Sequence, residues 1–242
     1  MIEIKNIIKK FGSKMVLDDI SLEIPEGQKI AVIGPSGCGK STLLRLIIKL
    51  DLPTSGNIYI DNQNIKFLSG DNLLKFRRKM GFVFQSSALF DSLTVGENVG
   101  FGLREQTWLK KDEIDKIVKE KLKMVELGGA ENLMPAELSG GMQKRVSLAR
   151  AIAFNPKIIL YDEPTTGLDP IISATIENLI NKLSKELKIT SILVTHQLST
   201  IFRCAERIVM LIDGKNYELG DPAAARQTQI KKAHDFFQAG LV

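Results

Sequence analysis

A glycine-rich stretch at residues 34–42, GPSGCGKST, has the composition of a phosphate-binding loop. It fits the pattern G-x-x-x-x-G-K-[ST], follows the apolar run KIAVI and opens a segment with helical spacing. Glycines permit backbone turns in which N–H groups converge on phosphate, and a lysine there neutralises β- and γ-phosphate oxygens. The stretch therefore predicts a nucleoside triphosphate site formed by Gly34, Pro35, Ser36, Gly37, Cys38, Gly39, Lys40, Ser41 and Thr42.

Two adjacent carboxylates follow the apolar residues 158–160. We expect Asp162 to orient the water shell of Mg²⁺, with Ser41 supplying its hydroxyl to the ion, and Glu163 to polarise the attacking water as general base. An acidic pair at a strand end can also merely start a turn, and Pro164 is compatible with that alternative. The phosphate loop upstream favours the catalytic interpretation.

Gln85 and His196 each follow a β-rich run. Because the carboxyl ends of parallel strands face the ligand in nucleotide-binding folds, His196 is predicted to contact the γ-phosphate. Gln85 is predicted to ligate Mg²⁺ or to hold the attacking water. A histidine at a strand end is more often structural, and an isolated glutamine carries no signal, so both assignments depend on the two motifs above.

The elements that must position these residues are short. β-rich runs lie at residues 2–11, 21–24, 29–34 and 55–65, and residues 71–127 are mainly helical. One helix face there is formed by Ile114, Ile117, Val118, Leu122, Val125 and Leu127. After residue 138, predicted helices 141–154, 171–187 and 199–205 alternate with strands 157–164, 190–196 and 207–214. This order predicts an α/β core with a mostly parallel sheet and a helical insertion.

The composition is that of a globular protein, with 44% hydrophobic and 25% charged residues among 242. The net charge of +5 comes from basic clusters scattered among acids, which predicts a solvated surface and no nucleic-acid partner. Cys38 lies in the phosphate loop, where a disulfide would block it, so we expect a reducing compartment. No apolar run approaches the roughly 20 residues of a membrane-spanning helix, and the first residues lack a signal-peptide core.

A second glycine pair occurs in ELSGGMQKRV, residues 137–146, and begins a predicted helix. A helix N-terminus attracts phosphate, so the chain holds two phosphate-binding elements. LSGG at residues 138–141 is the signature of ABC-transporter ATPase subunits, which the chain resembles over nearly its whole length. The other motifs of that family follow in order: GPSGCGKST, Gln85, IILYDEP, GLDP at 167–170 and His196.

The resemblance implies the fold of an ABC ATPase: a phosphate-loop NTPase core with a mostly parallel sheet, an N-terminal antiparallel β part and a helical subdomain. It implies one domain over residues 1–242. Residues 1–85 and 136–220 would form the core, about 86–135 the helical subdomain and 221–242 a C-terminal extension. It also implies ATP and Mg²⁺ as cofactors, with Phe11 stacking on adenine and Val16 beside it.

In this family two subunits pair head to tail, so the resemblance implies a homodimer in which each signature grips the partner's ATP. The residues implied in that contact are Ser139, Gly140, Gly141, Met142 and, in the GLDP motif, Asp169. The family's subunits power an integral-membrane permease. Residues 86–103, SSALFDSLTVGENVGFGL, lie where the family forms the groove for a cytoplasmic permease helix, although ordinary subdomain packing would need similar residues.

Within the family the chain resembles the Mla-type phospholipid-transport (toluene-tolerance) ATPases. That resemblance rests on Met142 after the signature, the stretch 134–171, FGLRE at 101–105 and the ending AHDFFQAG. It implies a periplasmic lipid-binding component and a place on the cytoplasmic face of the bacterial inner membrane. The alternative is the ATPase of an amino-acid or other small-solute importer. A ribosome- or DNA-associated ABC protein is disfavoured because the chain has one ATPase module. A non-hydrolysing regulatory module is disfavoured because the predicted catalytic residues are all present.

Two smaller expectations concern the tail and a thiol. Phe236, Phe237, Leu241 and Val242 are apolar anchors that either dock on the other subunit or belong to a frayed tail. Cys38 lies near a predicted helix N-terminus, which predicts a lowered thiol pKa and alkylation that blocks ATP binding.

Overall fold

The first part of the chain forms a four-stranded antiparallel sheet, order β2-β1-β4-β5, in the computed structural model, which describes residues 1–239. Alternate residues of β1 such as Ile2 and Ile4 are buried whereas Lys5 is exposed, as in a strand with one covered face. β2 is longer than predicted because it pairs with β1 from its first residue. The strands are β1 (Ile2–Phe11), β2 (Lys14–Ile24), β4 (Ser55–Ile60) and β5 (Gln63–Asn64).

A six-stranded sheet, order β10-β9-β3-β8-β7-β6, forms the centre of the molecule. All neighbouring pairs are parallel except β9 with β10, so the predicted mostly parallel sheet is confirmed. The inner strands are almost wholly buried, as their continuous apolar runs require when both faces are covered. The strands are β3 (Lys29–Ile33), β6 (Met80–Val83), β7 (Ile158–Asp162), β8 (Thr190–Val194), β9 (Arg207–Ile212) and β10 (Lys215–Gly220).

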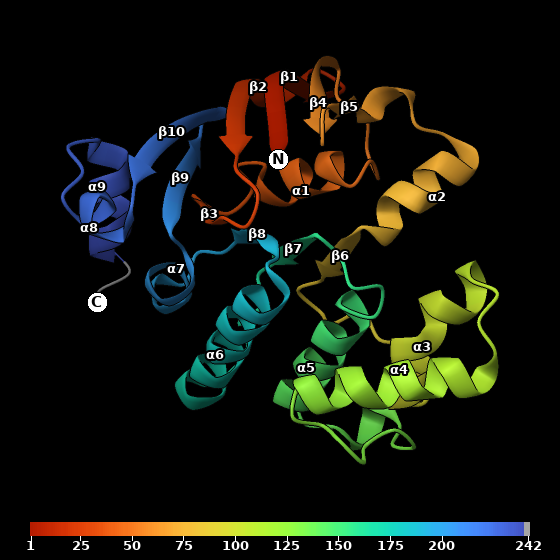
Figure 1. The fold of residues 1–242 in the computed structure, drawn as a ribbon. Helices are drawn as coiled ribbons and strands as arrows, with labels where there is room; N and C mark the ends of the chain where they lie inside the picture. The colour runs from red at the N-terminus through yellow and green to blue at the C-terminus, as the bar shows by residue number, and fades with distance from the viewer. Residues whose placement is uncertain (240–242) are drawn as a thin grey trace.

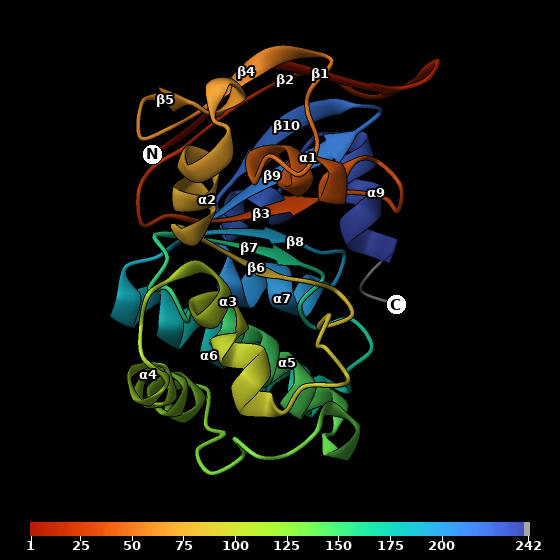
Figure 2. The same ribbon diagram turned by 90° about the vertical axis from the view of Figure 1, so that its right-hand side faces the viewer.

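Helices cover both faces of this central sheet (Figures 1 and 2). The antiparallel sheet lies on one side with α1 (Lys40–Ile47), and α2 (Gly70–Arg78) extends from that side. The helical subdomain of α3 (Val95–Gln106) and α4 (Lys111–Met124) lies on the other side. That side also holds α5 (Gly140–Ala151), α6 (Pro170–Leu187) and α7 (Leu198–Cys204). Short 3₁₀ turns occupy Ile65–Phe67 and Pro135–Glu137.

The helical subdomain has the predicted core face. Val118, Leu122 and Val125 are buried, and α3 packs closely on α4 at Gly100, where an added Cβ would lie 3.0 Å from Ile114 Cγ2. α3 begins with a capping box in which Thr94 accepts from the Glu97 N–H and the Glu97 side chain accepts from the Thr94 N–H.

Buried Asn98 organises the loop before α3. Its Nδ2 donates to the carbonyl oxygens of Phe90, Leu93 and Thr94 at 3.0–3.1 Å, and its Oδ1 accepts from the Phe90 N–H at 2.8 Å. A single side chain thus satisfies the turning backbone of this loop, which would otherwise leave buried polar groups unpaired. Residues 90–94 are therefore held in one shape.

The end of the described chain folds back onto the same subunit. α8 (Pro222–Arg226) and α9 (Lys231–Ala239) follow β10. Phe237 is buried, with its ring 5.6 Å from that of Phe202 on α7, and the Arg226 guanidinium lies over Phe202. The frayed-tail interpretation is thus wrong for residues 222–239, whereas the proposed anchors Leu241 and Val242 lie outside the described residues. Within residues 1–239 every helix is too short or too polar to cross a bilayer.

Candidate functional site

A cavity of about 570 Å³ opens where the loop between β3 and α1 meets the carboxyl ends of neighbouring strands. Of the predicted site residues it brings together Val16, Gly34, Pro35, Ser36, Gly37, Gly39, Lys40, Ser41, Thr42, Gln85, Glu163 and His196. These residues come from five separate parts of the chain. The cavity therefore gathers the groups that the sequence placed at strand ends, as parallel sheets do.

The phosphate loop requires glycine at two of its positions. Gly34 has φ +146°, and a Cβ there would lie 2.2 Å from the carbonyl oxygen of Leu211. Gly39 has φ +104°, and its Cβ would lie 2.8 Å from Leu17. Side chains at either position would displace the neighbouring strands, so the loop keeps its shape only with glycine.

Lys40 is buried at the first turn of α1, and its ammonium is held by the loop itself. Nζ donates to the carbonyl oxygens of Gly34 at 2.8 Å and Pro35 at 2.9 Å. These bonds keep the cation beside the loop N–H groups before any ligand binds. A triphosphate entering the cavity would meet an ammonium already in place.

Ser41 and Asp162 come into contact although they are far apart in the sequence. Ser41 Oγ donates to Asp162 Oδ1 at 2.9 Å, which joins the start of α1 to the end of β7. Burial raises the pKa of Asp162, and the bond from Ser41 and the charge of Lys40 oppose that shift. A hydroxyl and a carboxylate at this distance are the donor types that a hard divalent cation uses together with phosphate oxygens.

Glu163 is the most constrained carboxylate of the cavity. Oε1 lies 2.8 Å from Nδ1 of His196, and Oε2 accepts from Thr166 at 2.9 Å and Thr195 at 3.2 Å. The residue is 8% exposed and has φ +50°, a left-handed conformation that non-glycine residues rarely adopt. Strain of this kind is held by the surrounding bonds, and it is common at functional sites.

Sequence reasoning missed several residues of this site. Thr195 and Thr166 fix the Glu163 carboxylate, and their closeness in sequence to His196 and Glu163 was the available signal. Buried Lys144 donates to the Gln85 carbonyl oxygen across 59 positions of sequence. Phe236 of α9 also lines the cavity, and no local pattern connects it to the phosphate loop.

Two predicted triphosphate contacts do not line the cavity in this structure. Phe11 ends β1 with half of its surface exposed, and Lys9 Nζ lies 4.6 Å from its ring centre. Cys38 is half-buried, and the prediction of a lowered thiol pKa is wrong. Burial raises the pKa of Cys38 and outweighs the opposing charge of Lys40, because a thiolate loses hydration there.

The signature residues lie outside the cavity, at the starts of two helices. Ser139 is the N-cap of α5 and accepts from the Met142 N–H at 3.3 Å. Asp169 is the N-cap of α6 and accepts from the N–H groups of Ile171 and Ile172. Ser139, Gly140 and Asp169 are exposed, so this second group of predicted contacts is open to a molecule outside the chain.

Comparison with known proteins identifies the family. Residues 17–166 match the family described as ABC transporter. The intermembrane phospholipid transport system ATP-binding protein MlaF of Haemophilus influenzae is 41% identical over 98% of this chain and 90% of MlaF. The Fe(3+) ions import ATP-binding protein FbpC of Escherichia coli K12 is 40% identical over 91% of the chain. The chain spans only 62% of the length of that protein.

Two further similarities bear on fold and family. The chloroplastic protein TRIGALACTOSYLDIACYLGLYCEROL 3 of Arabidopsis thaliana is 45% identical over 89% of this chain and 67% of its own. A dimeric structure of the ATP-binding cassette MJ0796 in a post-hydrolysis state, bound to ADP and Pi, is 42% identical. It superposes with a TM-score of 0.81 and covers 90% of this chain and 99% of that one. The protein thus belongs to the ABC transporter family, in which it is an ATP-binding subunit that hydrolyses ATP.

Proposed function

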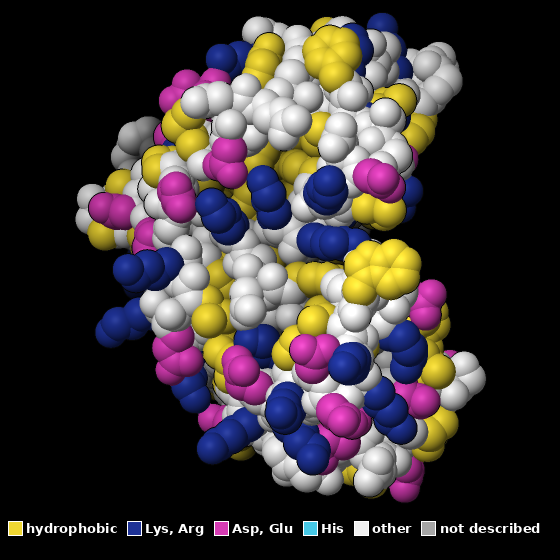
Figure 3. Space-filling model, turned by 45° about the vertical axis from the view of Figure 1, so that its right-hand side comes forward, with side chains coloured by type: hydrophobic (Ala, Val, Ile, Leu, Met, Phe, Trp, Pro, Cys, Tyr) yellow, Lys and Arg dark blue, Asp and Glu magenta, His cyan; other side chains and the backbone are white. Residues whose placement is uncertain are grey.

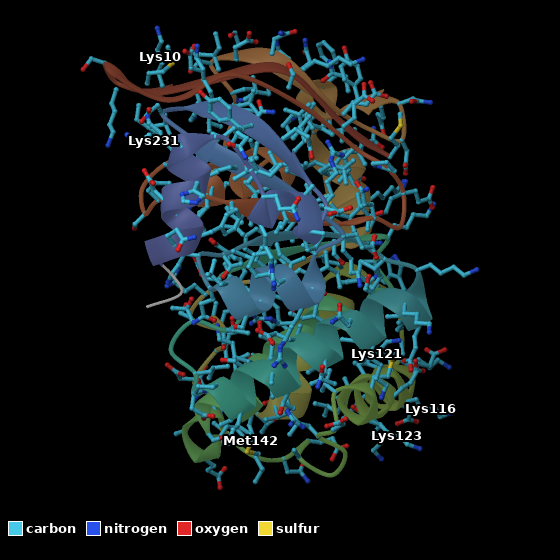
Figure 4. The ribbon with its side chains drawn as sticks, turned by 90° about the vertical axis from the view of Figure 1, so that its left-hand side faces the viewer. Lys10, Lys116, Lys121, Lys123, Met142 and Lys231 are labelled. Carbon is cyan, nitrogen blue, oxygen red and sulfur yellow. The ribbon has the colours of Figure 1, made fainter. Side chains whose placement is uncertain are left out.

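We propose that this chain powers phospholipid movement between bacterial membranes, as a nucleotide-sandwich homodimer bound to an integral-membrane permease at the cytoplasmic face of the inner membrane. The dimer is inferred from the division of the predicted ATP contacts between two separate places on the subunit. The groups proposed for chemistry lie at one cavity, whereas Ser139 and Asp169 are exposed caps that begin two helices outside it. Figure 4 shows Met142 and Lys10, the neighbour of Phe11, near opposite ends of the molecule, which fits head-to-tail pairing. MJ0796 is dimeric in the structure described above and in a second similar one.

Mg²⁺ is the metal ion that fits the donors beside the cavity. Asp162 and Ser41 are already in contact, and Gln85 adds an amide at the same opening. Residues 1–239 contain no group of three His, Cys, Asp or Glu side chains suited to an all-protein metal cage. Mg²⁺ is commonly held by one or two carboxylates and the substrate phosphates, and it would neutralise charge on the transferred phosphoryl group.

The residues around the cavity fit hydrolysis of a bound triphosphate. Lys40 would exchange its two carbonyl partners for phosphate oxygens. Glu163, oriented by Thr166 and Thr195, would accept a proton from the attacking water. His196 contacts Glu163 through Nδ1, so Nε2 remains available for the γ-phosphate. Ser139 and the first turn of α5 in the partner subunit would complete the site, so closing requires ATP at the contact between both halves.

The sandwich is tested with Glu163→Gln, which removes the base but keeps the size of the side chain. We expect hydrolysis to fall by about 10²–10⁴-fold, the usual contribution of a general base. ATP binding remains, so light scattering should detect a stable dimer with ATP and Mg²⁺. Adding Ser139→Arg in the same chain should abolish the dimer without preventing ATP binding. Only monomer in the single variant, with and without the membrane partner, contradicts the sandwich.

The permease surface is proposed to be a groove between α2 and the end of α3. A hollow of about 640 Å³ is lined by residues that include Leu74, Arg78, Arg104 and exposed Trp108. Figure 3 shows Lys and Arg side chains around a hollow between the upper and lower parts of the molecule. The loop that includes Phe90 continues this surface along α3, because the Phe90 ring packs at a tilt against Phe101 of that helix, with ring centres 4.7 Å apart. Aromatic and arginine side chains are typical anchors of protein contacts.

Phe90→Asp is expected to uncouple ATPase activity from transport, because it places a charge where an apolar permease side chain would pack. A loss of about 2 kcal/mol in permease affinity is a typical effect at such an anchor. Leu52→Asp is the control, since Leu52 is also exposed, at 58% against 45% for Phe90, but belongs neither to this loop nor to the groove. Transport by the reconstituted complex and permease binding are the measurements, and unchanged transport with Phe90→Asp would count against this groove.

Phospholipid is favoured as cargo because the MlaF match covers almost the full length of both proteins. The second candidate is import of iron or another small solute, which the 40% identity to FbpC favours. Purification of the tagged chain from membranes separates the two. A co-purifying permease with a lipid-binding component and phospholipid supports the first, and a solute-binding protein supports the second.

A further inference from the structure

The segment after Gln85 has a strained backbone. Ser87 and Ala88 have φ values of +61° and +48°, so two consecutive non-glycine residues occupy the left-handed region. Residues of these types adopt that region rarely, and a consecutive pair persists only where surrounding contacts hold it. Residues 85–88, here called the Q-loop turn, therefore need a source of restraint outside their own backbone.

Two cations of α5 supply that restraint. Lys144 Nζ donates to the carbonyl oxygen of Gln85. Arg150 donates to the carbonyl oxygens of Ala88 at 2.5 Å and Ser87 at 2.7 Å. Three carbonyl groups of one turn are thus bound by side chains of a single helix, and both residues of left-handed conformation are among them.

These contacts are unusual because the cations have no carboxylate partner in contact. Lys144 is 4% exposed, and no ion pair within 4.0 Å joins either cation to any of residues 1–239. Burial lowers the pKa of both side chains, although the charges of Glu163 and Asp162 partly offset this for Lys144. Burying a cation costs free energy that packing alone would not offset. The bonds from these cations to backbone carbonyl oxygens therefore indicate that they position the turn.

The same helix begins at the signature. Ser139 caps the N-terminus of α5, Lys144 follows within two turns and Arg150 lies in its last turn. α5 therefore connects the exposed signature to the turn that carries Gln85 into the nucleotide cavity. Any displacement of the helix along its axis must move the Q-loop turn or break these three bonds.

We propose that Lys144 and Arg150 are positioning residues that join the Q-loop turn to α5 as one rigid unit, so that a subunit's signature and its own Gln85 move together. The consequence rests on the sandwich proposed above. There, the signature of a subunit contacts ATP bound by its partner, whereas Gln85 serves ATP in its own cavity. The two cations then connect the two nucleotide sites mechanically.

The rigid unit is tested on the nucleotide-free chain, where no dimer is needed. Hydrogen exchange of the Ser87 amide, which bonds to the Phe84 carbonyl at 3.1 Å, reports on the turn. Lys144→Met and Arg150→Met should each accelerate exchange of this amide by at least about tenfold. In each variant the Q-loop turn can open without breaking the hydrogen bonds that the cation donates in the wild type. Arg145→Met is the matched control: it removes a cation from the same helix, but one that contacts Glu126 instead. Unchanged exchange in both test variants overturns the rigid unit.

The connection between sites is tested by ATPase kinetics. Lys144→Met should lower kcat by about 10–100-fold, as loss of a group supporting a ligand does, with a smaller change in KM for ATP. The Hill coefficient for ATP should also fall towards that of independent sites. Lys144→Arg should restore kcat and the Hill coefficient, since a single N–H donor is enough for the bond to the Gln85 carbonyl oxygen. Arg150→Lys should rescue Arg150→Met only in part, because the lysine ammonium lacks the rigid planar fork through which Arg150 reaches two carbonyl oxygens with two separate nitrogens.

The outcomes separate this inference from the sandwich itself. A wild-type Hill coefficient of one with no ATP-dependent dimer contradicts the sandwich and with it the connection between sites, whereas the exchange result still decides the rigid unit. A cooperative wild type whose Hill coefficient survives Lys144→Met overturns the connection alone. Equal losses of protection across the whole chain would show general destabilisation and would also count against a positioning role.

Discussion

At the scale of single residues, the carboxylate proposed as the general base is held in place by its hydrogen bonds. Glu163 reaches its position through a left-handed backbone and keeps it through His196, Thr166 and Thr195. Both carboxylate oxygens have partners in the structure, so a base at this position would not have to reorganise when water binds. Asp162, its neighbour in sequence, contacts Ser41 instead. Two adjacent acids thus have different partners, which fits the separate tasks proposed for them.

The two thiols give a prediction with a definite pH dependence. Burial raises the pKa of Cys38, and it raises that of Cys204 to about 12. Alkylation follows the thiolate, which becomes scarcer at a given pH when the pKa rises. Iodoacetamide should therefore modify Cys38 slowly at neutral pH and about tenfold faster per pH unit up to its pKa. Cys204 should react only on unfolding.

Peptide mass spectrometry measures both sites, with a free cysteine peptide as reference. ATP should slow modification of Cys38, because the residue lies in the phosphate loop, and leave Cys204 unchanged. Labelling of Cys38 at neutral pH as fast as the reference would show that the loop N–H groups dominate over burial.

At the scale of elements, the two helices that begin with exposed caps are packed together. A Cβ on Gly141 of α5 would lie 2.6 Å from Ile172 Cγ2, in the first turn of α6. The neighbouring Gly140 has room, since its nearest atom would be 3.5 Å away on Leu168. The signature and the GLDP motif are therefore held at a fixed separation by a contact that only a glycine permits.

Gly141→Ala should force the two helix starts apart. We expect a loss of about 1–3 kcal/mol in the free energy of unfolding, the usual cost of overpacking, and weaker ATP-dependent dimerisation in the Glu163→Gln background. Gly140→Ala should leave the free energy of unfolding within about 1 kcal/mol, because alanine favours the helix and would make only an ordinary contact with Leu168. Urea unfolding measures the stability of the two variants, and light scattering measures their ATP-dependent dimerisation. Equal stability of the two variants would contradict the packing argument.

At the scale of the whole molecule, the C-terminal helices close the far edge of the central sheet. Phe237 and Ala233 of α9 pack in the same cluster as Ile208 and Met210 of β9 and Ile201 of α7. α7 follows His196, and Phe236 lines the nucleotide cavity. The end of the described chain is thus part of the folded core beside the site. Docking of this tail on the other subunit stays a prediction, because the packing described here lies within one subunit.

Phe237→Ala should lower the free energy of unfolding by about 3 kcal/mol, because it leaves a cavity in this cluster. Phe67→Ala is the control: that side chain is 78% exposed, so its loss should cost no more than about 0.5 kcal/mol. Chemical denaturation of both variants is the measurement. Similar free energies for the two would show that α9 contributes nothing to the fold.

The sequence by itself determined whatever depends on neighbouring residues. The phosphate loop, the acidic pair and the alternation of strands and helices are local patterns, and the parallel sheet with its helical subdomain is confirmed. Twelve of the predicted contacts line one cavity. Most of them do so because they follow strands of the parallel sheet, whose ends meet at one edge, whereas Val16 reaches the cavity from β2 of the antiparallel sheet.

Only the tertiary structure decided which distant groups touch and how much water they lose. Lys144 and Gln85 are 59 positions apart, and no periodic pattern pairs them. The helix N-terminus predicted a lowered Cys38 pKa, but burial reversed the sign, because desolvation depends on packing from several elements at once. Phe236 likewise reaches the cavity only because α9 packs beside it, which no local pattern predicts. Local spacing fixes which chemistry is available, whereas burial and long-range contact fix where that chemistry is held.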